Sequence, residues 1–120
     1  MKIEAKRWLQ QAKEDLDSAE FNFHGNRYNV ASFLCQQTAE KALKALLIQK
    51  TGSFPKIHDL TRLAKLTNSP KKILERCAAI NPAYILSRYP DSPQSYSHQD
   101  CIKSLSYTKE VLEWAQKKLK

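Results

Sequence analysis

Glycine is nearly absent from this sequence: only Gly25 and Gly52 occur among its 120 residues. An all-β protein needs many tight turns, where glycine is a favoured residue, so the shortage argues against that class. Ala, Leu, Lys, Glu and Gln are frequent instead, and these residues favour helices. The composition and the length therefore predict one all-α domain that spans residues 1–120.

Cysteine pairs and long apolar runs are missing as well. Cys35, Cys77 and Cys101 form no C-x-x-C pair, so we expect free thiols in a reducing cytosol and no metal site. The longest strongly apolar run, residues 45–48, is too short to span a bilayer, and the N-terminus lacks the apolar core of a signal peptide. No glycine-rich phosphate loop or serine nucleophile pattern occurs. We expect a soluble, cytoplasmic protein without a cofactor or membrane association.

Acidic residues are few relative to basic ones. The formal net charge is +8, and residues 51–120 carry twelve Lys and Arg against six Asp and Glu. The excess therefore lies in the second part of the chain, around residues 87–98. It favours a phosphate-bearing partner such as a nucleotide or RNA. A solvated basic surface is an equally good interpretation of the same count.

Apolar residues recur at steps of three and four, which is the pattern of amphipathic helices. Two long helices joined by a short turn should pack antiparallel, and the remaining segments should complete an up-and-down bundle of about four to five helices. The expected helices are 3–23, 28–50, a short one from about 58, one from 70 that breaks at Asn81–Pro82, and one after Ser97.

Several residues should fix the ends of these helices and the extent of the core. We expect a positive φ at Gly25, an N-cap at Asp59, and an N-cap at Ser69 with Pro70 in the first turn. The short third helix should bury Leu60, Leu63, Ala64 and Leu66, and the last helix Ile102, Leu105, Leu112, Ala115 and Leu119. Tyr107, Val111 and Trp114 widen the last apolar face, which predicts either a thick core or a surface sealed by a partner chain.

The segment "SRYP" at 87–90 combines an arginine and a tyrosine with a proline. Pro90 forces Tyr89 out of the α region, so the preceding helix must end there. Arg88 would then be a cation that offsets the helix macrodipole. Alternatively, its guanidinium binds phosphate and Tyr89 stacks on a base.

His58 and His98 are the candidate proton-transfer groups. With Arg88 they include the parts needed for metal-independent RNA cleavage, namely a base for the 2′-hydroxyl proton and a cation for the phosphorane. Local capping or packing is the ordinary role of either histidine taken alone.

The stretch "CQQTAEKALKALL" at 35–47 carries a third signal. Glu40 and Lys44 are spaced i, i+4, which usually indicates a surface ion pair. Gln36 and Gln37 lie beside the apolar stripe and weigh against that simple interpretation.

These motifs together resemble the HEPN domains of bacteria and archaea. The resemblance rests on four stretches that follow one another along nearly the whole chain: "AKRWLQQAKEDLDSAE" at 5–20, "FLCQQTAEKALKALLI" at 33–48, "IHDLTRL" at 57–63 and "SRYPD" at 87–91. It implies a helical bundle that forms a homodimer with a basic cleft at the dimer face. Together with the residue chemistry above, we expect the nucleotide- or RNA-binding residues to be Gln37, Glu40, Lys44, Asp59, Arg88 and Tyr89.

The resemblance further implies a partner protein, and three functions remain open. HEPN proteins often work with a separately encoded minimal nucleotidyltransferase, as halves of a two-component, toxin–antitoxin type of system. We expect a binding module of that kind; the alternatives are a metal-independent endoribonuclease toxin that uses Arg88 with His98 or His58, and a non-enzymatic interaction scaffold. Nine residues separate Arg88 from His98, more than in the ribonuclease members, so little or no RNA cleavage is expected.

Overall fold

The structure is a computed structural model that describes residues 1–87, 89–90 and 95–120. All regular elements in this part of the chain are helices, and none of them is long and apolar enough to cross a membrane. The expected all-α class is confirmed, and the break at Asn81–Pro82 separates off one short extra helix. The elements are α1 (Ile3–His24), α2 (Tyr28–Thr51), α3 (Leu60–Leu66), α4 (Lys71–Ile80), α5 (Ala83–Leu86) and α6 (His98–Leu119).

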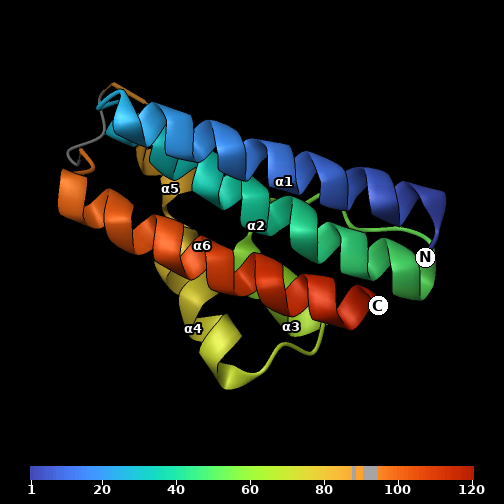
Figure 1. Ribbon diagram of the computed structural model, residues 1–120. Coiled ribbons are helices and arrows are strands. Elements are labelled where there is room, and N and C mark those ends of the chain that lie inside the picture. Colours follow the sequence, from blue (N-terminus) through green and yellow to red (C-terminus); the bar gives the residue numbers. More distant parts are fainter. Residues whose placement is uncertain (88, 91–94) are drawn as a thin grey trace.

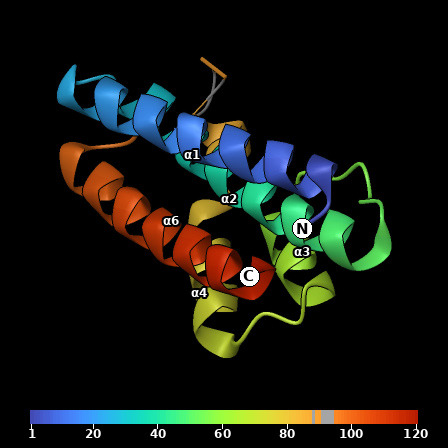
Figure 2. The same cartoon turned by 45° about the vertical axis from the view of Figure 1, so that its right-hand side comes forward.

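The three long helices lie side by side, and the short ones cover the far side of α2 and α6 (Figures 1 and 2). As expected, α1 and α2 are antiparallel (Figure 1). α6 runs in the same direction as α2, because the first residue of α6, His98, contacts the first residue of α2, Tyr28. The direction of α6 matters for the site, because it decides which end of the bundle holds His98.

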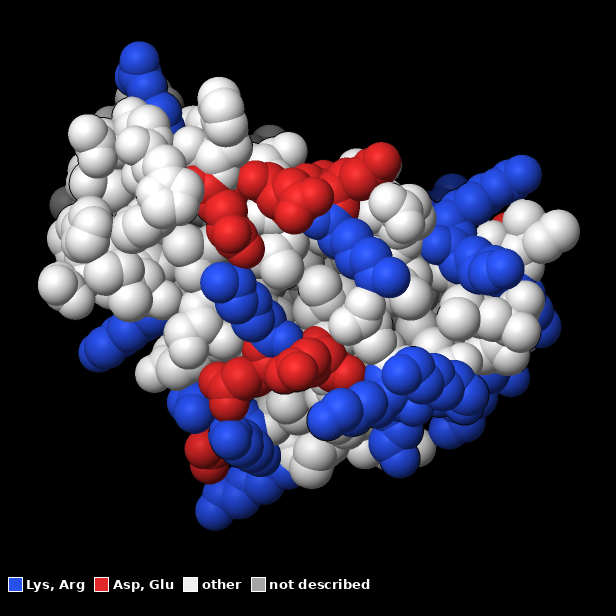
Figure 3. Space-filling view, viewed as in Figure 1, with Lys and Arg blue, Asp and Glu red and all other residues white. Residues whose placement is uncertain are grey.

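Charge is unevenly spread over the surface. In Figure 3, Lys and Arg side chains gather around the C-terminal end of α6, whereas the end that holds the α1–α2 turn is mostly uncharged. Lys117, Lys118 and Lys120 all lie at the end of α6. On this face the basic side chains of the described part of the second half gather at the end of α6, whereas Arg88 of the segment 87–98 lies outside the described residues.

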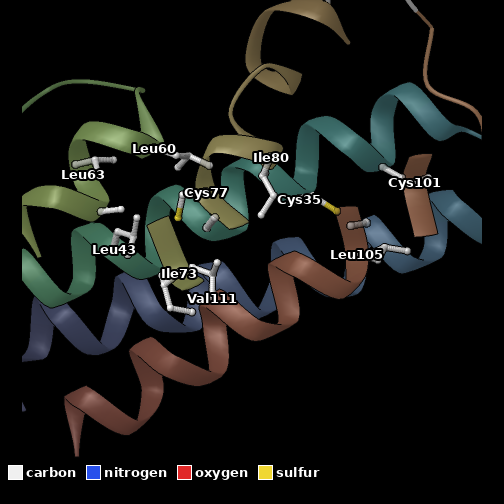
Figure 4. Close-up of a cluster of buried hydrophobic side chains, with 14 of the residues drawn as sticks. Cys35, Leu43, Leu60, Leu63, Ile73, Cys77, Ile80, Cys101, Leu105 and Val111 are labelled. Atoms are coloured by element: carbon white, nitrogen blue, oxygen red, sulfur yellow. The ribbon is translucent and has the colours of Figure 1, made fainter. Parts of the chain in front are cut away.

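The core is built around α2, which is buried on most of its sides (Figure 4). The larger cluster joins α2 to α3, α4 and α6 through Leu43, Leu60, Leu63, Ile73, Cys77, Ile80 and Val111. A smaller cluster lies among α1, α2 and α6, and Leu46 and Trp114 pack against both. α2 is thus held on several sides, which leaves its polar residues little freedom.

The wide apolar face of α6 belongs to a thick core. Val111 is fully buried, and Tyr107 and Trp114 are partly buried against the main cluster, so most of this face packs within the chain, and cover by a partner chain stays a prediction. Leu66 and Ile102, which were expected in the core, are 45% and 40% exposed. Both were assigned by spacing alone, which does not show whether another element covers a side chain.

The α1–α2 turn differs from the expectation. Gly25 has a φ of −87°, and the positive φ falls one residue later, on Asn26 at 63°. Asparagine tolerates this left-handed conformation better than most residues. The prediction that Gly25 has a positive φ was therefore wrong.

The start of α4 is also shifted. Pro70 is the N-cap residue, and the helix begins at Lys71. Ser69 does not cap the helix, because its hydroxyl is 2.9 Å from the hydroxyl of Thr67. The extended ψ of Pro70, 162°, keeps it outside the helix. The predicted roles of Ser69 and Pro70 were therefore wrong by one position.

Candidate functional site

A buried ion pair lies at the centre of the candidate site. Lys44 Nζ is 2.9 Å from Glu40 Oε2, and both residues are only 3% exposed. The interpretation of this spacing as a surface ion pair is therefore wrong. Two charges removed from water cost several kcal/mol each, so a buried pair persists only with good geometry and further partners.

Aromatic rings enclose the lysine end of the pair. Lys44 Nζ lies 5.1 Å from the ring centre of Phe54 and 5.8 Å from that of Trp8. These two rings pack edge to face with centroids 4.6 Å apart. The ring faces supply favourable electrostatic contact to the ammonium group where water is excluded.

His58 and Gln36 complete the shell of the Glu40 carboxylate. His58 Nδ1 lies 3.1 Å from each of its oxygens. Gln36 Nε2 donates to Glu40 Oε1 at 3.2 Å and to the backbone carbonyl of His58 at 3.0 Å. A ring nitrogen that faces a carboxylate carries the hydrogen, so Nε2 of a neutral His58 is the nitrogen left to accept one.

This buried row reaches the surface at His58, whose side chain is 52% exposed. The imidazole stacks on Tyr84 of α5, with ring centres 4.5 Å apart and planes 14° from parallel. The two rings border a pocket of about 340 Å³, which is also lined by Asn81, Pro82 and Ile85. We call Gln36, Glu40, Lys44, His58 and Tyr84 together the His58 site.

Asp59 has a structural role beside this site. As predicted, it caps α3: its carboxylate accepts from the backbone N–H groups of Thr61, at 3.0 Å, and Arg62. The same oxygen accepts from Asn81 Nδ2 at 3.1 Å, and Asn81 Oδ1 accepts from the N–H of Leu60. Asp59 and Asn81 thereby fix the loop that presents His58.

Gln36, rather than Gln37, contacts Glu40 and His58 in the structure, and the binding role expected of Gln37 stays a prediction. Gln36 is fully buried and contacts both Glu40 and His58. Gln37 donates only to Gln36 Oε1, at 2.7 Å, among the contacts of the described residues. Gln36 stands four residues before Glu40, so the i, i+4 rule applied once more would have found it.

His98 lies elsewhere in the molecule. Its ring packs against Phe23, with centres 4.9 Å apart, and Tyr28, at 5.6 Å. Tyr28 and Glu40 are twelve residues apart on α2, and this spacing corresponds to roughly 18 Å along the helix axis. Within one chain, therefore, His58 and His98 do not share a site.

The capping box at the start of α6 explains the fixed position of His98. Ser97 accepts from the N–H of Asp100, and the Asp100 carboxylate accepts from the N–H of Ser97. This bond to the backbone of Ser97 lowers the pKa of Asp100 below its usual range. In the structure His98 thus packs locally at a capped helix start, and its catalytic role stays a prediction.

The structure describes only part of the "SRYP" motif, namely Ser87, Tyr89 and Pro90. Tyr89 is 50% exposed, and Arg88 lies outside the described residues. The predicted contacts of Arg88 with phosphate therefore stay a prediction. Tyr84 is the tyrosine that stacks in the His58 site, and no sequence signal had marked it.

The three cysteines supply no nucleophile. All are free and buried. Burial raises the pKa of Cys35 and of Cys77 to about 12. Both thiols are therefore protonated at neutral pH, whereas the reactive form of a cysteine is the thiolate.

Comparison with known proteins gives a consistent family assignment. The HEPN domain family matches residues 5–119. The chain is 34% identical to an archaeal HEPN homologue of known structure, with all of both chains covered and a TM-score of 0.83. It is 28% identical to a protein of Thermus thermophilus, over 96% of this chain and 98% of that one, with a TM-score of 0.87.

A more distant structure shares the fold. A HEPN domain protein of Thermotoga maritima is 21% identical, over 92% of this chain and 95% of that one, with a TM-score of 0.76. No protein with a curated description matches the chain.

Proposed function

The chain belongs to the HEPN family, and from that premise we propose that it binds a nucleotide or RNA as a homodimer, as the HEPN half of a two-component system with a minimal nucleotidyltransferase. The observation that carries the binding proposal is the row Lys44–Glu40–His58, which is buried at one end and open at the other. The ligand contact would be made at the exposed imidazole and the stacked ring of Tyr84.

The desolvation cost of the buried Glu40–Lys44 pair supports a binding role for this row of residues. A buried ion pair contributes little net stability compared with well-packed apolar residues. Here it holds one ring nitrogen of His58 on Glu40 and leaves the other nitrogen available to a ligand. Tyr84 adds an aromatic surface, and stacking of a base on such a surface contributes about 1–3 kcal/mol. A base edge that donates an N–H to Nε2, with a base stacked on the tyrosine, fits the neutral imidazole, whereas a phosphate oxygen fits the protonated imidazole, in which Nε2 also donates.

Fluorescence anisotropy with a labelled single-stranded RNA tests the binding proposal. We expect His58→Ala and Tyr84→Ala each to weaken binding about tenfold, because each removes one contact of roughly 1–2 kcal/mol. His24→Ala is the matched control: His24 is an exposed histidine at the end of α1, outside the His58 site. Equal affinity of the His58 and His24 variants would contradict the proposal.

Exposed apolar side chains beside the site support the homodimer. Ile85, which lines the site pocket, is 58% exposed, and Val30 on α2 is 48% exposed. Val30 is three residues before Phe33, whose ring lies 6.2 Å from that of Tyr84. A second copy placed over this face would cover these residues and bring two His58 sites together, as a symmetric interface does.

Sedimentation equilibrium of Ile85→Asp tests this assembly. We expect the wild type to be dimeric at tens of micromolar protein and Ile85→Asp to be monomeric, because the change buries an unpaired charge in the interface. Leu66→Asp is the control, since Leu66 is 45% exposed on α3 and outside this face. A monomeric wild type at that concentration would refute the dimer.

The partner nucleotidyltransferase is tested by co-expression. A short nucleotidyltransferase reading frame beside the gene should encode a protein that copurifies with this chain through a tag on either one. If the two proteins separate at physiological salt, the two-component proposal fails while nucleotide binding remains testable.

A second candidate function is metal-independent RNA cleavage. The geometry that favours it is the Glu40–His58 dyad, because a carboxylate that holds Nδ1 orients an imidazole to act as a base through Nε2. Incubation of labelled RNA with the protein in EDTA decides the question. Cleavage that is lost in Glu40→Gln and His58→Ala, and kept in His98→Ala, would establish His58 as the base; absence of cleavage in the wild type leaves the binding module.

A further inference from the structure

A second pocket opens at the far end of α2, where the last turns of α2, α3 and α6 meet. Its volume is about 290 Å³, and Leu47, Lys50, Asn68, Trp114 and Lys118 are among its lining residues. Lys50 lies ten residues beyond Glu40 on α2, about 15 Å along the helix axis. None of the residues of the His58 site lines this pocket. We call it the Trp114 pocket.

One wall of the Trp114 pocket is aromatic and rigid. Trp114 is partly buried and packs against both clusters of the core, so its indole is held in place. Leu46 and Leu47 add apolar surface beside it. A fixed aromatic side chain with aliphatic neighbours is the surface on which a planar ring stacks.

The other wall is basic. Lys50 comes from α2 and Lys118 from α6, and no carboxylate side chain is among the lining residues. Within the part of the chain that the structure describes, neither lysine takes part in an ion pair. Figure 3 shows Lys and Arg gathered over this end of α6. The pocket therefore attracts an anion.

A simpler explanation for the positions of Lys50 and Lys118 is that each cation offsets the macrodipole of its own helix. Both lie in the last turn of a helix, where a cation contributes about 0.3–1 kcal/mol. That effect accounts for a lysine at each helix end. It does not account for a hollow between the two that has an indole wall and no acidic residue.

We propose that the Trp114 pocket binds a nucleoside monophosphate, with the base against the indole and the phosphate between Lys50 and Lys118. The volume lies at the small end of the range for ligand pockets, which suits one nucleotide. This site is separate from the His58 site and holds whether or not the His58 site binds RNA.

The two tryptophans make the test specific. In a ¹H–¹⁵N spectrum each indole N–H gives one resonance, and Trp114→Phe assigns that of Trp114. Titration with AMP and with UMP should shift the Trp114 resonance saturably in the wild type and equally in His58→Ala. Adenosine and ribose 5-phosphate, which each lack one half of the ligand, should bind at least tenfold more weakly.

Charge variants test the phosphate contact without disturbing the core. We expect Lys50→Gln and Lys118→Gln each to raise the Kd for AMP about three- to tenfold, because each removes one ionic hydrogen bond at a partly solvated site. Lys117→Gln is the matched control, since Lys117 is exposed on the same turn of α6 and does not line the pocket.

Three results would overturn the proposal. They are an unmoved Trp114 resonance at millimolar AMP and UMP, an effect of Lys117→Gln equal to that of Lys118→Gln, and a response to an RNA oligonucleotide with none to the free nucleotides. A shift that is lost in His58→Ala would assign the binding to the His58 site instead.

Discussion

Removal of either charge of the buried Glu40–Lys44 pair should destabilise the protein to unequal extents. Lys44 has one acceptor, Glu40, among the contacts of the described residues, and otherwise faces two rings. Glu40→Met therefore leaves a buried cation without a carboxylate, and should cost about 3–5 kcal/mol. Lys44→Met should cost less, about 1–3 kcal/mol, because His58 and Gln36 still contact the Glu40 carboxylate.

The double variant Glu40→Met/Lys44→Met should recover most of this loss. With both charges removed, two methionines of similar length fill the space and nothing charged stays buried, so the net change should be within about 1 kcal/mol of zero. Urea unfolding followed by far-ultraviolet circular dichroism measures all four proteins of the cycle. The coupling energy expected from these values is on the order of 3 kcal/mol or more.

An exposed pair provides the control for this cycle. Lys109 Nζ lies 3.5 Å from Glu20 Oε1, and their side chains are 54% and 41% exposed. Lys109→Met and Glu20→Met should each change the unfolding free energy by less than about 1 kcal/mol. If Glu40→Met and Lys44→Met behave like these two and add without coupling, the reasoning about burial is wrong.

Three further changes test local features. Ser97→Ala removes one half of the capping box of α6, and should cost about 1 kcal/mol in urea unfolding. Gly52→Ala, at a φ of 86°, should cost about 1 kcal/mol, whereas Gly25→Ala, at a φ of −87° with ordinary Cβ contacts, should be nearly neutral. Because burial raises the pKa of Cys35 and Cys77 from 9.0 to about 12, the folded state keeps protons that the unfolded state loses. Stability should therefore fall as pH rises from about 9 to 12, and Cys77→Ala should reduce that slope; a flat profile would contradict it.

Local patterns were enough to predict the helices. Steps of three and four placed α1, α2 and α6 to within a residue or two, and Asp59 and Asn81–Pro82 marked a real helix start and a real break. These helix positions and ends depend on residues that are near one another in the sequence, so the sequence alone is enough to predict them.

The burial of the ion pair could not be predicted in the same way. An i, i+4 pair on a helix has the same spacing whether it faces water or the core. What buries Lys44 and Glu40 is Trp8 from α1, Phe54 from the loop after α2 and His58 from the loop before α3. Contacts between distant segments decide the outcome, and the spacing does not record them.

The two histidines show the same limit. Arg88, Tyr89 and His98 are close in the sequence, which favoured one site around the proline-rich loop. Because α6 runs parallel to α2, however, His98 sits at the α1–α2 turn, while His58 faces the middle of α2. The direction of α6 therefore keeps His98 away from His58, and sequence distance alone could not show this.

Stability alone does not explain why the middle of α2 carries polar residues. Gln36, Glu40 and Lys44 recur every four residues on a helix whose other buried side chains are small or apolar, and each is at most 3% exposed. Apolar side chains at these positions would fill the same space without the desolvation cost. Their shared feature is that Gln36 and Glu40 contact His58 directly and Lys44 contacts Glu40. The row therefore makes physical sense as a device that fixes one imidazole at the surface, and the double variant separates the two explanations: a stable protein that no longer binds RNA supports positioning, whereas one that still binds with wild-type affinity refutes it.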